Sequence, residues 1–324
     1  MRTKKDVIKS VMIGHAVGDA LGVPVEFCTR EELLKNPVKD MMGYGSYPVP
    51  AGAWSDDTSM SVAALDSLAN GEIRYDEIMG NFVKWAKCDD YTPTGEMFDI
   101  GFTCKTAIRL FFEGEGFSAL ACGLPYENAN GNGSLMRIHP FVLMVYFRKE
   151  LRPVADMIFE NASRLTHAHE RSVLACKIYG RLLFSLIENP SKESIFKALA
   201  EAKAMYADSY EYAAYRRLFL SNFKDLPACE IRSSGYVVDT LEAAIWCLLT
   251  TDSYEKCVLK AVNLGEDTDT VAAVAGGLAG ALYGYEAIPK KWRDTLIKRE
   301  YIEEMCDRAA RNWSDFVSQS DDKK

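Results

Sequence analysis

The sequence predicts an all-α protein folded as a single compact domain over residues 1–324. Three observations lead to this prediction. Apolar residues recur at intervals of three and four along most of the chain, whereas the strict alternation typical of strands is scarce. Hydrophobic residues make up 48% of the sequence, which is enough for a large core. No linker rich in proline, glycine or serine and no fixed-period repeat divides the chain.

Twelve segments carry the helical spacing, and several begin with residues that commonly cap helices. Asp56 and Asp57, Asp76, Ser191 and Ser253 stand at such starts, where a side-chain oxygen can accept a hydrogen bond from a free backbone N–H. The longer irregular segments could be functional loops. The expected helices are 5–21, 57–70, 75–88, 101–113, 134–148, 153–165, 168–188, 191–206, 239–251, 254–263, 268–284 and 300–317, and the expected loops are 22–55, 89–100, 114–133 and 220–236.

Charge and hydropathy exclude several classes of protein. A net charge of −8 argues against a basic nucleic-acid-binding surface, so a small polar ligand is expected. The longest apolar stretch, 271–283, is too short to cross a bilayer, and the start "MRTKKDVIKS" lacks the apolar core of a signal peptide. Nine cysteines without a CxxC pair fit reduced, mostly buried thiols. We expect a cytoplasmic monomer without a membrane partner.

Two stretches share one layout, in which acids and hydroxyls precede an apolar helix: "GAWSDDTSMSVAALDSLANG" (52–71) and "GEDTDTVAAVAGGLAGALYG" (265–284). If the two helix starts meet, four carboxylates and two hydroxyls gather there, and the carboxylates repel one another. A hard cation such as Mg²⁺ or Ca²⁺, which prefers oxygen ligands, would neutralise them. The alternative is ordinary N-capping, worth ~1 kcal/mol per residue. The residues concerned are Ser55, Asp56, Asp57, Asp267, Asp269 and Thr270.

A third stretch, "IGHAVGDALGVPVEF" (13–27), spaces three glycines four residues apart. Gly14, Gly18 and Gly22 would share one helix face and let another backbone pack closely. We expect Asp19 to be a structural hydrogen-bond acceptor. Glu26 follows in an extended segment and could either reach a site or remain solvated.

The segment "NANGNGSLMRIHP" (128–140) could bind an anion. If a helix starts near residue 134, the free N–H groups of its first turn and its dipole face the glycine-rich loop. A diphosphate would fit there, contacted by Gly131, Asn132, Gly133 and Ser134. The alternative is a plain glycine turn before a capped helix, and Arg137 is expected to be structural.

These stretches resemble the ADP-ribosylglycohydrolase family. The resemblance implies an all-α fold around a binuclear Mg²⁺ centre, with Mn²⁺ in some members, that removes ADP-ribose from a modified protein or small molecule. It favours the diphosphate interpretation of the glycine loop. The motifs that carry it are "GHAVGDALGVPVEF", "WSDDTSM", "DIGFTCKTAI", "GNGSLMRIHP", "THAHE" and "GEDTDTVAAVAGGLAGALYG".

The resemblance also implies roles for individual residues. The six residues at the two helix starts, Ser55, Asp56, Asp57, Asp267, Asp269 and Thr270, would be metal ligands, although many relatives have threonine at position 55. Glu26 matches a mobile glutamate that touches the metal centre or its water. Glu266 stands where glycine is common, and this extra acid could point to solvent or contact the residues that surround the metal ligands.

The four histidines and Asp99 complete the residue assignments. His167 of "THAHE" would lie beside the ligand, whereas His169 is expected to cap the next helix. His15 and His139 lie in apolar sequence and are expected to be structural. Asp99 would contact the acceptor guanidinium of arginine-linked substrates, or else cap the following helix. We expect it to lie outside the metal cluster.

The expected reaction is metal-assisted hydrolysis at C1 of the distal ribose, with Glu26, Asp57 and Asp99 as the catalytic acids. An arginine side chain is the expected acceptor. Two other functions remain open, namely a non-catalytic ADP-ribose-binding protein and a hydrolase for another ADP-ribosyl or nucleotide-like substrate on serine, nucleic acid or a small molecule.

Overall fold

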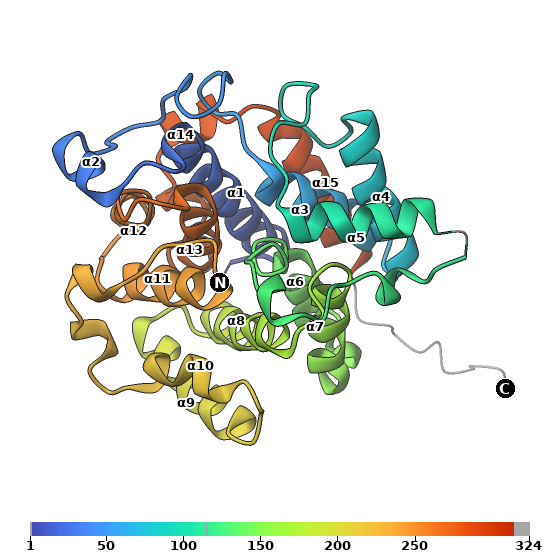
Figure 1. The fold of residues 1–324 in the computed structure, drawn as a ribbon. Helices are drawn as coiled ribbons and strands as arrows, with labels where there is room; N and C mark the ends of the chain where they lie inside the picture. Colours follow the sequence, from blue (N-terminus) through green and yellow to red (C-terminus); the bar gives the residue numbers. More distant parts are fainter. Residues whose placement is uncertain (1, 115, 314–324) are drawn as a thin grey trace, which may run out of the picture.

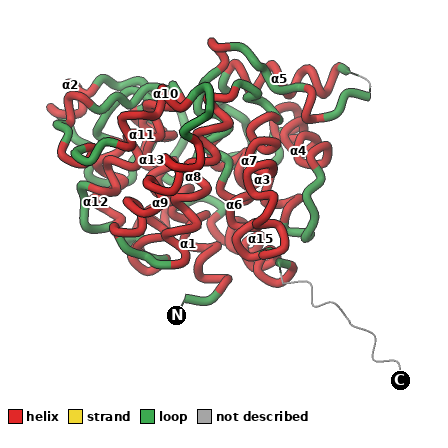
Figure 2. The backbone as a smooth tube through the Cα atoms, turned by 90° about the horizontal axis from the view of Figure 1, so that it is seen from below, coloured by secondary structure: helices red, strands yellow, loops and turns green. Residues whose placement is uncertain are grey.

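The regular elements of the protein are helices, as predicted. A computed structural model describes residues 2–114 and 116–313, and within these ranges it contains α- and 3-10 helices and no strand (Figures 1 and 2). No helix in this part of the chain is long and apolar enough to span a bilayer. The α-helices are α1 (Lys4–Gly22), α2 (Arg30–Lys35), α3 (Asp56–Leu68), α4 (Tyr75–Cys88), α5 (Phe102–Glu113), α6 (His139–Phe147), α7 (Ala155–Arg164), α8 (Glu170–Glu188), α9 (Lys192–Tyr206), α10 (Tyr212–Tyr215), α11 (Val237–Leu249), α12 (Tyr254–Val262), α13 (Thr268–Tyr283), α14 (Lys290–Thr295) and α15 (Arg299–Asn312).

Helices α1 and α13, from opposite ends of the chain, lie side by side at the centre of the molecule (Figure 1). The predicted close approach of backbones is confirmed. A Cβ atom at Gly18 would lie 2.1 Å from the carbonyl oxygen of Ala272, and one at Gly22 would lie 2.3 Å from the Cα atom of Asp269. Only glycine leaves room for this contact. The end of α1 is thereby held against the acidic start of α13.

A large hydrophobic core surrounds this helix pair. Buried side chains from α1 through α15 belong to one continuous cluster, and Trp54, Trp85, Trp292 and Trp313 are almost fully enclosed. All nine cysteines are free thiols and most are buried, as expected. The helices therefore form one compact domain.

Helix α6 begins five residues later than the predicted 134–148. Pro140 explains the difference, because proline lacks a backbone N–H and is tolerated only in the first turn of a helix. In the structure Pro140 is the second residue of α6. The preceding residues form a turn, in which the N–H of Met136 donates to the carbonyl oxygen of Asn132 at 3.0 Å.

Three short helices were not predicted, namely α2, α10 and α14. The start of α2 does carry a readable signal, because Thr29 and Glu32 form a reciprocal capping box. The last expected helix, 300–317, ends at Asn312 in the structure, and the expected positions 314–317 lie outside the described residues.

The predicted helix caps are partly confirmed. Ser191 and Ser253 cap α9 and α12 through their side chains. Asp76 does not cap α4, because its Oδ1 accepts from the backbone N–H of Ala119 at 2.7 Å. Asp56 and Asp57 are the first residues of α3, and Ser55 caps that helix instead.

Candidate active site

The acidic starts of α3 and α13 meet, as the two matching motifs predicted. Ser55 precedes α3, and Asp267 precedes α13. Thr270 of α13 donates from Oγ1 to Oδ2 of Asp57 across the two helices at 3.2 Å, and Oγ of Ser55 donates to the same oxygen at 3.1 Å. One carboxylate oxygen therefore collects both hydroxyls that were expected in the cluster.

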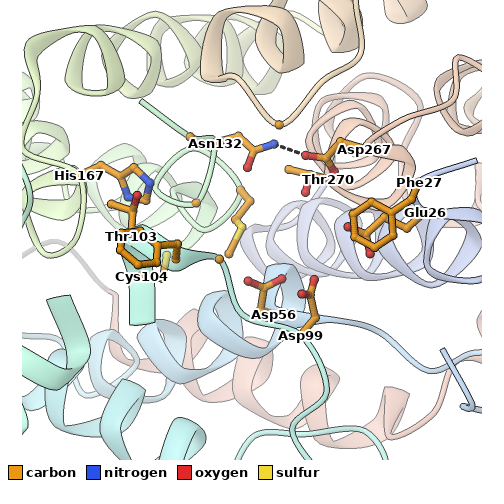
Figure 3. Close-up of a pocket in the computed structure, with 16 residues that line it drawn as sticks. Glu26, Phe27, Asp56, Asp99, Thr103, Cys104, Asn132, His167, Asp267 and Thr270 are labelled. Carbon is orange, nitrogen blue, oxygen red and sulfur yellow. Dashed lines mark hydrogen bonds between the residues drawn. The ribbon is translucent and has the colours of Figure 1, made fainter. Parts of the chain in front are cut away.

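Two groups of acids form at this junction and share one residue. Carboxylate oxygens of Asp19, Asp57 and Asp269 lie within 4.8 Å of one another, and so do those of Glu26, Asp99 and Asp269. Such spacing suits ligands around one or two cations. Asp57 and Asp269 were predicted members, whereas Asp56 and Asp267 belong to neither group and lie on the wall of the adjacent cavity (Figure 3).

Burial and mutual repulsion disfavour the charged forms of these acids. Burial, followed by the charges of neighbouring carboxylates, raises the pKa values of Asp57 and Asp269 well above their usual range. Burial and then the charges of Asp99 and Asp267 raise the pKa of Glu26 to about 8. Without a cation, the cluster therefore has to hold protons near neutral pH.

Several buried oxygens in the cluster have no hydrogen-bond partner among the described residues. They are Oδ1 of Asp57, Oε2 of Glu26 and Oδ1 of Asp267. Buried polar atoms in folded proteins almost always have a partner. Three unpartnered carboxylate oxygens around one junction are consistent with a site built for a cation.

Asp19 is a hydrogen-bond acceptor within the protein, as expected. Its carboxylate accepts from the backbone N–H groups of Ser55 and Thr58 at 2.9 and 3.0 Å, and from Oγ1 of Thr58 at 2.6 Å. These bonds use most of its lone pairs. Asp19 therefore fixes the first turn of α3 from the end of α1.

Asp99 lies within the acidic cluster, contrary to the expectation that it would stand apart. The loop before α5 folds over the start of α3, so that Asp99 lies next to Asp56 (Figure 3). After burial, Asp99 is the largest cause of the raised pKa of Asp56. The loop has no periodic pattern from which this fold-back could be predicted.

A cavity of about 290 Å³ opens above the acids (Figure 3). Four of the described residues that line it are carboxylates, and none is lysine or arginine. Any anionic ligand would need cations or backbone N–H groups to bind there. The lining consists of Glu26, Phe27, Asp56, Asp99, Gly101, Phe102, Thr103, Cys104, Gly131, Asn132, Gly133, Met136, His167, Gly235, Asp267 and Thr270.

The glycine loop forms another part of the cavity wall. Gly131 and Gly133 line the cavity, and Asn132 donates from Nδ2 to Oδ2 of Asp267 at 2.7 Å. Asn132 thus joins the loop to the acidic start of α13. A Cβ atom at Gly133 would lie 2.9 Å from the ring of His167, so the loop needs glycine here.

Ser134 does not line the cavity, contrary to its predicted contact with the ligand. Its Oγ accepts from Oγ of Ser163 at 2.9 Å inside the core. Because α6 begins only at His139, the loop also lacks the predicted helix start. Arg137 has the expected structural role, since it is buried and donates to the carbonyl oxygen of Gly133.

His167 lines the cavity as a neutral side chain. Burial lowers its pKa to about 3, and Thr166 Oγ1 lies 2.7 Å from its Nδ1. His169 caps α8 by accepting a backbone N–H, as predicted. His15 and His139 are fully buried with ring centroids 4.4 Å apart, which agrees with their expected structural role.

Sequence reasoning missed aromatic residues around the acids. Phe27 and Phe102 line the cavity and are largely exposed. The ring of Tyr47 lies 6.5 Å from that of Phe27, and burial and then the charges of Asp99 and Glu26 raise the pKa of its hydroxyl well above the usual range. Tyr47 comes from the irregular segment 22–55, which offered no signal for its position.

The fold is all-α, and its candidate active site is an acid-lined cavity between helix starts. The ADP-ribosylglycohydrolase family model matches residues 1–316, and the chain belongs to this family. It is therefore an ADP-ribosylglycohydrolase, a hydrolase of glycosyl bonds.

Named relatives match over most of this chain. An "ADP-ribosylarginine hydrolase Tri1" of Serratia proteamaculans is 34% identical over 94% of this chain and 78% of its own length. The "ADP-ribosyl-[dinitrogen reductase] glycohydrolase" of Rhodospirillum rubrum is 32% identical over 88% of each chain. A solved "ADP-ribosylglycohydrolase-related protein complex" aligns with a TM-score of 0.81 and 29% identity, covering 97% of this chain and 100% of that one.

Proposed function

We propose that this protein uses Mg²⁺ to hydrolyse the bond between C1 of the distal ribose of ADP-ribose and an arginine side chain of a modified protein. The observation that carries the proposal is the pair of acid groups that share Asp269, with unpartnered carboxylate oxygens beside them. The names of relatives at 32–34% identity, which are ADP-ribosylarginine hydrolases, support arginine as the acceptor.

The six residues at the two helix starts have the ligand chemistry of hard cations, and two of them, Asp57 and Asp269, belong to the acid groups. All six offer oxygen atoms, and none offers the sulfur or imidazole ligands that softer metals prefer. When bound, Mg²⁺, or Mn²⁺ in its place, would supply positive charge that offsets the carboxylates and polarises ribose oxygens and water. The proposed ligands are Ser55, Asp56, Asp57, Asp267, Asp269 and Thr270.

The remaining residues bind the substrate and move protons. Glu26 is assigned to proton transfer, because its raised pKa keeps a proton available near neutral pH and its Oε2 is free. The backbone at Gly131 and Gly133 contacts the diphosphate, with neutral His167 beside it. Asp99 lies beside Glu26 in the cavity wall, where it can meet the leaving guanidinium.

Release of ADP-ribose from arginine, serine and nucleic-acid conjugates tests the proposal. We expect release from the arginine conjugate with Mg²⁺ or Mn²⁺ and none after chelation. Asp57→Asn should abolish it, whereas Asp252→Asn, which changes an exposed surface acid, should not. Activity that survives chelation would refute the metal-assisted reaction. ADP-ribose binding without any release would indicate a non-catalytic binding protein.

A further inference from the structure

Phe27 has an unusual backbone conformation for its residue type. Its φ angle is 67°, in the left-handed region that bulky side chains rarely adopt. Two backbone hydrogen bonds of 2.8 Å hold it there, from the N–H of Phe27 to the carbonyl of Glu266 and from the N–H of Glu266 to the carbonyl of Cys28. The residue that follows Glu26 is therefore fixed against the loop that carries Asp267.

Burial does not account for a phenylalanine at this position. The side chain of Phe27 is 70% exposed and lines the cavity above the acids. Its ring lies 6.5 Å from that of Tyr47, which in turn lies 5.0 Å from that of Phe98. Phe27 is therefore the end of a row of three aromatic rings. A strained, exposed aromatic residue at a cavity points to contact with a ligand.

The surroundings of Phe27 specify the chemistry of that ligand. Its neighbours in the cavity wall include Glu26 and Asp267, with Asp99 facing them (Figure 3). An aromatic face combined with carboxylates favours a planar cation, because a guanidinium stacks on the ring and keeps its N–H groups directed at the acids. A neutral acceptor such as a serine hydroxyl would gain nothing from the ring face.

We propose that Phe27 determines acceptor specificity by stacking on the guanidinium of ADP-ribosylated arginine. This inference rests on the proposed function and adds the residue that selects the acceptor. Phe27 is a specificity residue and takes no part in proton transfer. It should therefore influence KM for arginine conjugates, with little effect on kcat or on the affinity for free ADP-ribose.

The test is steady-state hydrolysis of ADP-ribosyl-arginine by the full chain, with calorimetric titration of free ADP-ribose. Phe27→Leu and Phe27→Gly should raise KM roughly 3- to 30-fold, the range for loss of a cation–π contact. Phe27→Trp should restore KM to near the wild-type value. The matched control is Tyr44→Gly, because Tyr44 is also left-handed (φ 58°) and 74% exposed but does not line the cavity.

Thermal unfolding separates the specificity role from a structural one. Phe27→Gly relieves the backbone strain and removes little buried surface, so its Tm should equal or exceed that of the wild type. An unchanged KM in Phe27→Leu would overturn the inference. A parallel loss of affinity for free ADP-ribose would also overturn it, because the ring would then contact the nucleotide. A wild-type protein inactive on ADP-ribosyl-arginine would instead refute the proposed function itself.

Discussion

Raising the pH in the absence of divalent cations should destabilise the protein, and Mg²⁺ should remove most of this effect. The raised pKa values of several acids in the cluster contribute, and Glu26 gives a contribution of known size, because its pKa is about 8 in the fold against 4.5 for the free side chain. The folded state keeps a proton that the unfolded state has already released. The stabilisation is therefore complete below pH 4.5 and is lost as the pH rises through 8.

The magnitude follows from the two pKa values. Between about pH 6.5 and 8.5, Glu26 should lower the free energy of unfolding by about 2 kcal/mol. Burial lowers the pKa values of His15, His139 and His167, so these side chains stay neutral in the fold, whereas in the unfolded state they are about half protonated at pH 6.5. Together they should raise the free energy of unfolding by about 1 kcal/mol across this range. Glu242, outside the cluster, has its pKa raised to about 7 by burial and should add to the loss about 1 kcal/mol that Mg²⁺ does not remove.

Thermal unfolding followed by circular dichroism, with EDTA or Mg²⁺, measures the contribution of Glu26, which Mg²⁺ removes, and that of Glu242, which it does not. The net loss from these acids and the histidines is about 2 kcal/mol, so at roughly 2 °C per kcal/mol for a domain of this size Tm in EDTA should fall by about 4 °C across the range. Glu26→Gln should remove the share of the Mg²⁺-dependent fall in Tm that comes from Glu26, about 4 °C. Glu242→Gln is the matched control and should remove only the contribution of about 1 kcal/mol that does not respond to Mg²⁺. A Tm in EDTA that stays constant or rises with pH would refute the reasoning.

Three further substitutions test how the site is held together. Gly18→Ala should destabilise the fold by about 1–3 kcal/mol in urea unfolding, because the added Cβ meets a carbonyl oxygen of α13. Gly80→Ala is the control. Open space surrounds Gly80, so this variant should be more stable by about 0.5–1 kcal/mol. Glu266→Gly should leave Tm unchanged or higher, because this exposed residue has a φ of 63°. Asn132→Leu should weaken Mg²⁺ binding, measured by calorimetry, roughly 10- to 100-fold through the lost bond to Asp267. Unchanged stability in Gly18→Ala, a lower Tm in Glu266→Gly or unchanged Mg²⁺ affinity in Asn132→Leu would each contradict the corresponding argument.

The helical parts of the site could be predicted because their signals are local. Acids followed by an apolar helix identified the starts of α3 and α13, and the spacing of Gly18 and Gly22 predicted the close contact between α1 and α13. The left-handed φ of Glu266 also gives a physical reason why glycine would suit that position.

The loop contributions could not be predicted, because they depend on contacts between distant segments. Asp99 reaches the acids only because its loop folds over α3, and Tyr47 reaches them from a segment without periodicity. Ser134 was predicted to contact the ligand but does not line the cavity, for a different reason. Its motif fitted a helix start, but Pro140 moved that start to His139 and the serine turned into the core.

Strain and charge accumulate at the same place in this fold. Phe27 and Glu266 both have left-handed backbones, which cost roughly 1–2 kcal/mol each, next to buried acids that repel one another. Such costs persist only where the surrounding structure enforces them. The two backbone bonds that join Phe27 and Cys28 to Glu266 do so here, and they limit how the neighbouring Glu26 can move. The resemblance implied a mobile glutamate. In this chain the backbone beside it is fixed to the loop that carries Asp267, so any movement of Glu26 has to come from its side chain unless both bonds break.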